Sequence, residues 1–515
     1  MVRDGYMRLK YVIKNSMFSI VILVVNIFIG LIRRSVMVKA LGPDLVGLSA
    51  LFGDVIGFLN VADIGLSGGI GAVLFKPIHE RNFKLISSIL NYYKKIYLTL
   101  GAIFVFLEGI LTMYICFMIS HPGISNNDVR LYFFLISINV ALTYFLTYRF
   151  ILISTDQNLY KYNIVSVIFK LIAASLEVIL LMYVTKSFMI YLLIELISNL
   201  LYIIVQNSII KRKYKELNTK QVILDIEIKN KVVKSLKGYG YNKIGNVAVF
   251  GTNYVYTALF SGLGGTAIYS NYQLLVSAMV SVCGITFNSL NSTIGNILAT
   301  ESEERVYKLF KLIFFINFWV ASLVGIIFYN SSRAFVSAWI GKNYVASTST
   351  VILFTAYFFF TSIRSSTEGF KAAGGIFYED RYVPLAEAAI NFIACISLGY
   401  KYGLAGVIGG NLISTLAIVT WEKPYMVFKL IFKRRLLDYF KELVFYIVVG
   451  VGALFLSMFV CRIVETQINF IGFIEDAVIS FLVVNIVFVA VFYNTKVFKE
   501  VIGYFKKVFA LIINR

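Results

Sequence analysis

Residues 17–38 read MFSIVILVVNIFIGLIRRSVMV, and this stretch decides the class of fold. Nearly all of its side chains are apolar, and about 20 such residues in a helix cross the hydrocarbon core of a bilayer. Similar apolar runs recur to the end of the chain, without the strict alternation of a membrane β-barrel. The sequence therefore predicts an all-α protein that crosses a membrane many times. The first run is also too long for the core of a signal peptide.

The composition points the same way, because 59% of the residues are apolar, against roughly 45–50% in an average soluble domain. We expect about 14 transmembrane helices. They are placed near 17–38, 46–75, 95–119, 130–153, 162–184, 188–210, 238–262, 266–298, 309–329, 348–370, 382–399, 403–421, 441–462 and 475–493.

The net charge of +21 predicts orientation rather than nucleic-acid binding. If the N-terminus is cytoplasmic, 35 lysines and arginines fall in inner segments and nine in outer segments. This imbalance predicts an even number of spans, with both termini in the cytoplasm. Four of the 48 cations belong to neither count and lie inside predicted spans: Arg149, Lys170, Lys243 and Arg364.

Residues 211–237 form the longest polar stretch and separate two sets of six predicted spans. We expect an N-terminal lobe at 1–210, a cytoplasmic linker at 211–237 and a C-terminal lobe at 238–421. An amphipathic segment, two further spans and an amphipathic tail make up 422–515. Leu41-Gly42 and Leu263-Gly264 recur 222 positions apart, which favours two pseudo-symmetric, parallel lobes with a cavity between them. The tail, 497–513, is expected to lie on the inner leaflet or to contact a partner.

No constellation typical of an enzyme is present in the sequence. His79 and His121 fall in different loops, the four cysteines lie in apolar runs, and no metal-ligand or phosphate-loop motif occurs. The short outer loops argue against a membrane glycan polymerase or ligase. We therefore expect no catalytic activity, no metal and no cofactor.

Charges at membrane depth are the informative residues, because each costs about 2.5–3.5 kcal/mol at a helix centre and is functional by default. The candidate cations for an anionic substrate are Arg34, Lys243, Arg364, Arg149 and Lys170. The alternatives are snorkelling for Lys243, Arg149 and Lys170, interface anchoring for Arg33 and Arg34, and an ion pair between Arg364 and Glu368. The candidate acids for a coupling ion, or for neutralising a cation, are Asp63, Glu387 and Glu368, followed by Asp54, Glu108, Glu177 and Glu195.

Three blocks of sequence resemble Wzx-type polysaccharide flippases. The first runs from Arg34 through Leu41-Gly42 to Ala62-Asp63-Ile64-Gly65 and on to Tyr92–Tyr97. The second joins Tyr269–Tyr272 to Thr293–Asn296 and Asn317–Trp319. The third holds Arg364, Phe370-Lys371, Gly374, Asp380-Arg381, Pro384, Glu387 and Asn391.

This resemblance implies the fold of the multidrug/oligosaccharidyl-lipid/polysaccharide exporter superfamily. It also implies a substrate, an undecaprenyl-diphosphate-linked oligosaccharide, flipped outward across a bacterial cytoplasmic membrane beside a polysaccharide polymerase and glycosyltransferases. The matching cavity cations would be Arg34, Lys243 and Arg364. Asn253 stands where similar sequences have an Asp, so an acidic role there is in doubt. A peptidoglycan-precursor flippase and a multidrug exporter of the same superfamily stay open.

Overall fold

The computed structural model describes residues 2–60, 70, 73–74, 77–78, 80–119, 123–154, 159–217, 226, 229, 252–288, 291–376, 379, 382–464 and 467–503. Within these ranges the chain is helical throughout, with turns and short loops and no strands. It divides into two compact units, Met1–Ser270 and Asn271–Arg515. The boundary lies inside one helix, and the lobe limits expected from the sequence stay a prediction.

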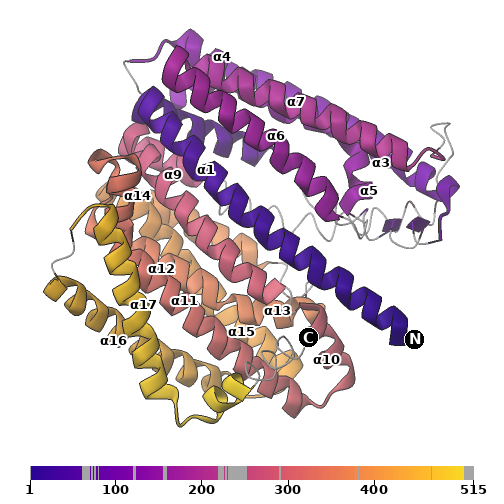
Figure 1. Cartoon of the computed structure of the whole chain (residues 1–515). Helices are drawn as coiled ribbons and strands as arrows, with labels where there is room; N and C mark the ends of the chain where they lie inside the picture. Colours follow the sequence, from indigo (N-terminus) through magenta and orange to yellow (C-terminus); the bar gives the residue numbers. More distant parts are fainter. Residues whose placement is uncertain are drawn as a thin grey trace. The chain divides into compact units, whose positions relative to one another are not determined.

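The described part of the first unit consists mainly of long helices (Figure 1). They are α1 (Val2–Leu59), α3 (Phe83–Tyr114), α4 (Asn126–Leu146), α5 (Ile151–Ser154), α6 (Leu159–Ile179), α7 (Phe188–Lys213) and the start of α9 (Asn253–Asn288). Short helical turns lie at η2 (Ile115–Met118), η3 (Tyr148–Phe150) and η4 (Leu180–Val184).

The second unit continues from α9 in the same style. It contains α10 (Asn291–Thr300), α11 (Glu303–Ile340), α12 (Thr348–Ile363), α13 (Ser365–Ala373), α14 (Val383–Ser414), α15 (Thr420–Val427), α16 (Leu436–Val464) and α17 (Phe470–Phe492). The turns η5 (Lys342–Tyr344), η6 (Thr415–Val419) and η7 (Phe428–Phe432) connect them, and a last helical segment covers 496–503.

Three of these helices are broken at a glycine with positive φ: Gly42 in α1, Gly262 in α9 and Gly403 in α14. The chain reverses direction at Gly403. The evidence is that Asn391, before the break, donates hydrogen bonds to Asn411 at 2.7 Å and to Ser414 at 3.2 Å, which both follow it. In a straight helix Asn391 and Ser414 would lie about 34 Å apart. The turn falls between the predicted spans 382–399 and 403–421.

Nine helical stretches in the described part of the chain are long and apolar enough to cross a membrane. Two of them contain a glycine break, Ile20–Leu59 and Val383–Phe432, and are far longer than the roughly 20 residues that one crossing needs. The predicted class, an all-α polytopic membrane protein, is thereby confirmed. The count of 14 spans stays a prediction.

Equivalent helices of the two units begin at a nearly constant offset. Ser125 caps the N-terminus of α4, and Ser347, 222 positions later, caps α12. Asn82 and Ser302 precede α3 and α11, 220 positions apart. These offsets agree with the repeat in the sequence and support a duplication.

Each unit has its own buried core. In the second unit the core is aromatic: Phe318 stacks on Tyr446 and on Phe488, with ring centroids 4.5 and 5.0 Å apart. The described start of the tail joins this core, because Phe498 is buried and stacks on Trp319. This part of the tail therefore packs against the core of the second unit, and its expected contact with the inner leaflet or a partner stays a prediction.

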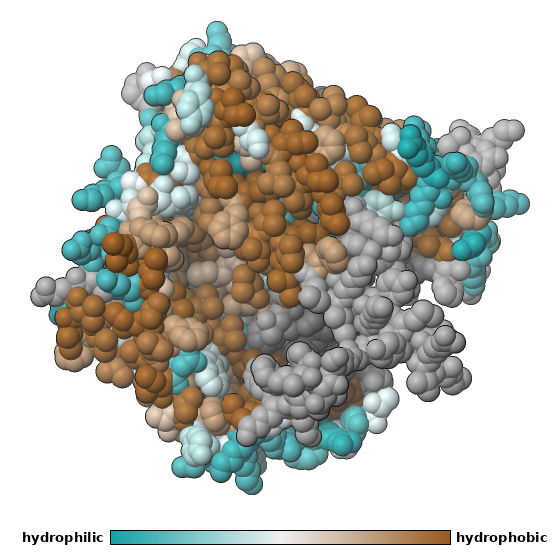
Figure 2. All heavy atoms as spheres, viewed as in Figure 1, coloured by the Kyte–Doolittle hydropathy of each residue, from teal (hydrophilic) through white to brown (hydrophobic). Residues whose placement is uncertain are grey.

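Apolar side chains also cover the outer faces of many helices (Figure 2). Phe106 of α3 is 68% exposed, and Ile486 of α17 is 65% exposed. Such continuous apolar surface is unfavourable in water and suits contact with lipid.

Candidate functional site

The first unit holds an ion cluster within its helical wall. Nε and Nη2 of Arg33 donate hydrogen bonds to the two carboxylate oxygens of Glu177, each at 2.7 Å. Arg33 also forms an ion pair with Glu195 and donates to the hydroxyl of Tyr191 at 3.4 Å. The three helices α1, α6 and α7 thus meet at one guanidinium.

This cluster lies toward the outer ends of the predicted spans 17–38, 162–184 and 188–210. Arg33 precedes the break at Gly42 by nine residues, which is about 13 Å along a helix. The side chain of Glu177 is only 1% exposed, so an unpaired charge there would be costly. Of the roles offered by the sequence, Glu177 and Glu195 therefore neutralise a cation, and Arg33 is bound in an ion cluster.

A second contact shows how α1 and α6 are aligned. Lys170 donates a hydrogen bond to Asn26 at 3.2 Å, seven residues before Glu177 and Arg33 on their respective helices. Both contacts therefore join residues 144 positions apart, so the two helices run parallel with a constant register. Parallel alignment agrees with the predicted direction of spans one and five. The Lys170 side chain is itself exposed.

Arg34 is half-buried and lies next to Arg33 in the sequence, but it turns to a different helix. Its guanidinium donates a hydrogen bond to the hydroxyl of Ser270 in α9. Asp54, also in α1, accepts a hydrogen bond at 2.8 Å from the backbone N–H of Tyr254, which lies in the first turn of α9. A carboxylate from α1 thus stabilises the start of α9, at the position where Asn253 replaces the expected acid.

Two candidate residues of the first unit, Lys243 and Asp63, lie outside the described residues, so their roles stay predictions. Arg149 is described and half-buried. It lies in η3, at the end of α4, beside a pocket that is treated separately below.

In the second unit, the predicted span 348–370 is broken at Arg364. The helix α12 ends at Ile363, and the short helix α13 begins at Ser365. Arg364 pairs with Glu368 across one helical turn, with Nε and Oε1 3.4 Å apart. The predicted ion pair is therefore present.

Glu368 is shared with a third residue that sequence reasoning did not place there. Lys423 of α15 contacts the same carboxylate oxygen as Arg364. Both cations are largely buried, with 15% and 16% of their side chains exposed. One carboxylate thus faces two cations.

Two further acids lie near this group and are buried. Oε1 of Glu387 and both carboxylate oxygens of Glu422 have no hydrogen-bond partner in the portion of the chain described here. A carboxylate in that position is stabilised by protonation, by a bound cation or by a conformation in which it reaches water. This agrees with the candidate role of Glu387, and it adds Glu422, which the sequence analysis did not identify.

The chain matches no protein-family model and no curated protein by sequence. Its structure is similar to that of the lipid II flippase MurJ in an inward closed conformation, with a TM-score of 0.68 at 15% identity. That alignment covers 93% of this chain and 99% of the flippase chain.

Multidrug transporters show a more partial likeness. An inward-facing MATE transporter of the MOP superfamily aligns with a TM-score of 0.57 and 13% identity, over 75% of this chain and 91% of its own. A MOP transporter from Pyrococcus furiosus, described as having a binding pocket of reversed polarity, aligns at 0.54 and 14% identity over 79% and 93%. Over nearly its whole length, this chain therefore has the fold of the multidrug/oligosaccharidyl-lipid/polysaccharide (MOP) exporter superfamily.

Proposed function

We propose that this chain is a transporter that flips an undecaprenyl-diphosphate-linked oligosaccharide from the inner to the outer leaflet by alternating access. The observation that carries the proposal is the extent of the structural likeness. The alignment with the lipid II flippase covers 93% of this chain. The alignment with the inward-facing MATE transporter covers 75% of this chain and 91% of the transporter. A lipid-linked substrate suits the more complete match.

The charges inside the helical walls fit an anionic headgroup. Arg34 is half-buried and its guanidinium donates to the hydroxyl of Ser270. In the second unit, Arg364 is largely buried and lies beside a second cation, Lys423, with which it contacts Glu368. Guanidinium groups bind phosphate oxygens in a bidentate manner, so Arg34, Arg364 and Lys243 are proposed to hold the diphosphate.

The proposed direction of transport follows from the negative charge of the substrate. A diphosphate carries roughly two negative charges, and an inside-negative potential of 100 mV favours outward movement of each by about 2.3 kcal/mol. The potential then suffices as the driving force if the protein carries no compensating charge across. The alternative driving force is a coupling ion, and the candidate acids Glu387 and Asp63 are proposed as sites for a proton or Na⁺.

The setting of the protein belongs to this proposal. It would lie in a bacterial cytoplasmic membrane with both termini in the cytoplasm, between the glycosyltransferases that build the saccharide and the polymerase that extends it. A second candidate function is the flipping of a peptidoglycan precursor, which the likeness to the lipid II flippase favours. A multidrug exporter fits less well, because cationic drugs would be repelled by the arginines.

The deciding experiment is a flipping assay in proteoliposomes containing the purified full-length chain. Fluorescent undecaprenyl-diphosphate oligosaccharide, lipid II and a cationic dye are compared as substrates. We expect protein-dependent transfer of the oligosaccharide lipid, reduced at least tenfold in Arg34→Gln and Arg364→Gln and unchanged in Lys401→Gln, an exposed cation of α14. Transfer of lipid II alone would support the second candidate, and transfer of the dye alone would overturn the assignment to lipid-linked substrates.

A further inference from the structure

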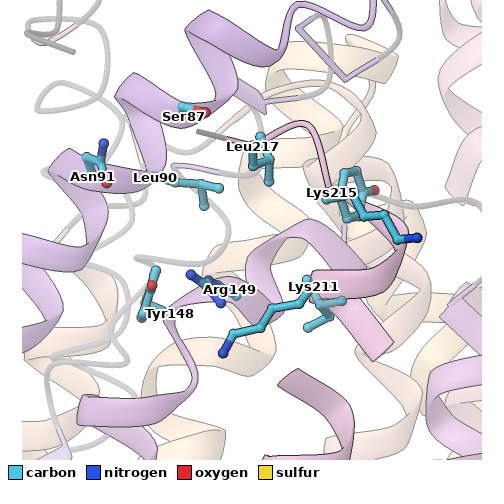
Figure 3. Close-up of a pocket in the computed structure, with 10 residues that line it drawn as sticks. Ser87, Leu90, Asn91, Tyr148, Arg149, Lys211, Lys215 and Leu217 are labelled. Atoms are coloured by element: carbon cyan, nitrogen blue, oxygen red, sulfur yellow. The ribbon is translucent and has the colours of Figure 1, made fainter. Parts of the chain in front are cut away.

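A pocket of about 330 Å³ lies in the first unit, and its lining contains none of Arg34, Lys243 and Arg364. It is formed where α3 begins, where η3 follows α4, and where α7 ends. The residues that matter in its lining are Ser87, Asn91, Tyr148, Arg149, Lys211 and Lys215. Figure 3 shows how these side chains surround it.

The lining is strongly cationic. It includes one arginine and two lysines but no aspartate or glutamate. Over the ranges covered by the structure, no ion pair joins Arg149, Lys211 or Lys215 to a carboxylate. Three cations around a small concave space repel one another, and an anion would relieve this repulsion.

Two of the three cations converge. In Figure 3 the guanidinium of Arg149 and the ammonium end of Lys211 point toward the same space, while Lys215 extends away from them. Arg149 is held in place by the ring of Tyr148, whose centroid lies 5.4 Å from its guanidinium carbon. The ammonium of Lys94 lies 5.6 Å from the same ring. The arginine is thus pre-positioned by a cation–π contact that leaves its N–H groups available.

A buried donor completes the arrangement. Ser87, in the second turn of α3, lines the pocket and is only 4% exposed. Its hydroxyl oxygen is buried and has no hydrogen-bond partner among the described residues. Leaving a buried hydroxyl unsatisfied is unfavourable, and a ligand oxygen in the pocket would remove that penalty.

We propose that this pocket is a binding site for a phosphate group, contacted by Arg149, Lys211 and Ser87. Arginine and lysine bind phosphate through charge-assisted hydrogen bonds, and serine adds a neutral donor. The volume is at the small end of the range for ligand pockets, roughly 300–1,000 Å³, so it admits a phosphorylated headgroup but not a complete lipid. The phosphate would come either from an anionic phospholipid or from a soluble phosphorylated molecule.

The position of the pocket along the chain favours the cytoplasmic side. Lys211, Arg212 and Lys213 end α7, and Lys84 and Lys94 lie near the start of α3, which the charge imbalance places inside. The cytoplasmic leaflet carries anionic headgroups that attract such groups of lysines and arginines. The site would accordingly be occupied from that leaflet or from the cytoplasm, whichever substrate the protein transports.

The test measures ligand-dependent thermal stability of the full-length chain, purified in a neutral detergent. The protein is titrated separately with phosphatidylglycerol, with phosphatidylcholine of the same acyl chains and with inorganic phosphate. The variants are Lys211→Gln, the double variant Arg149→Gln/Lys211→Gln, and the matched control Arg212→Gln. Arg212 is the next residue of α7 and does not line the pocket.

For the unsubstituted protein we expect Tm to rise with phosphatidylglycerol or with inorganic phosphate, and not with phosphatidylcholine. Apparent affinity should fall about tenfold in Lys211→Gln and further in the double variant, while Arg212→Gln keeps its affinity, because each ionic hydrogen bond is worth about one order of magnitude. A response to the lipid alone assigns the site to a headgroup, and a response to phosphate alone assigns it to a soluble ligand. No response to either, or equal weakening in Arg212→Gln, would overturn the proposal. The flipping assay in proteoliposomes tests the proposed roles of Arg34 and Arg364. Its result is independent of this titration, so the failure of one proposal can be distinguished from the failure of the other.

Discussion

Arg33 and Glu177, 144 positions apart in the chain, are joined by two parallel hydrogen bonds of 2.7 Å. The bidentate geometry is the strongest that an arginine and a carboxylate form. Because Glu195 contacts the same guanidinium, one cation compensates two acids inside the helical wall of the first unit. Arg33 is therefore predicted to contribute to stability rather than to substrate binding.

Replacing Arg33 by Gln should destabilise the protein by about 3–5 kcal/mol, because it leaves two carboxylates in the wall without their cation. The measurement is the midpoint of thermal or denaturant unfolding in detergent. The double variant Arg33→Gln/Glu177→Gln should lose less stability than the two single variants lose together. The reason is that it removes both members of the Arg33–Glu177 pair, so neither charge is left without the other. Additive effects in this cycle would mean that the two side chains are not coupled.

Replacing Arg364 by Gln should abolish flipping while the amount of protein in the membrane stays normal. Lys423 remains to pair with Glu368, so the carboxylate is not left alone when the guanidinium is removed. Transport and membrane protein level are measured on the same cells or proteoliposomes. Normal transport by this variant would show that the arginine serves only its ion pair with Glu368.

Flipping should respond to membrane voltage. An inside-negative potential imposed with K⁺ and valinomycin is expected to accelerate outward transfer, because the diphosphate moves negative charge down the potential. The rate is followed as the potential is stepped from zero to −100 mV. A rate that does not change with voltage would contradict uncompensated charge movement and would direct attention to Glu387 and Asp63 as ion sites.

The hairpin in α14 should depend on a close approach at Gly406. A Cβ atom there would overlap the carbonyl oxygen of Leu398, which is backbone and unable to rotate away. Gly406→Ala is therefore expected to cost at least 1–3 kcal/mol of stability, as overpacking does. Gly409→Ala is the matched control, since its Cβ would meet only an ordinary contact at 3.7 Å. Equal unfolding midpoints for the two variants would contradict this account of the hairpin.

Several features of the fold were accessible from local sequence. The predicted turn between spans 382–399 and 403–421 falls at Gly403, where positive φ suits a residue without a side chain. The offset of 222 reappears between the helix caps Ser125 and Ser347. The turn depends on the backbone geometry of one residue, and each helix start depends on a capping hydrogen bond within a few residues. Such local features can be read from the sequence directly.

Other features were missed because their partners come from distant parts of the chain. The spacing of Arg364 and Glu368 predicts their ion pair, but Lys423 reaches the same carboxylate from α15, 55 residues later. Helix lengths were also underestimated: α11 runs from Glu303 to Ile340, well beyond the predicted span 309–329, because its polar ends continue the helix. A hydropathy pattern reports the part in lipid and not the whole helix.

The sequence by itself determined that this protein is helical and crosses a membrane repeatedly, because a backbone in lipid must satisfy its hydrogen bonds within each helix. It also predicts which charges lie at membrane depth. Only the tertiary structure decided what those charges do. The register between α1 and α6 binds Arg33 to Glu177, whereas the next residue, Arg34, points to α9 and Ser270. Adjacent residues on a helix project about 100° apart, so identical side chains acquire different partners once neighbouring helices are packed.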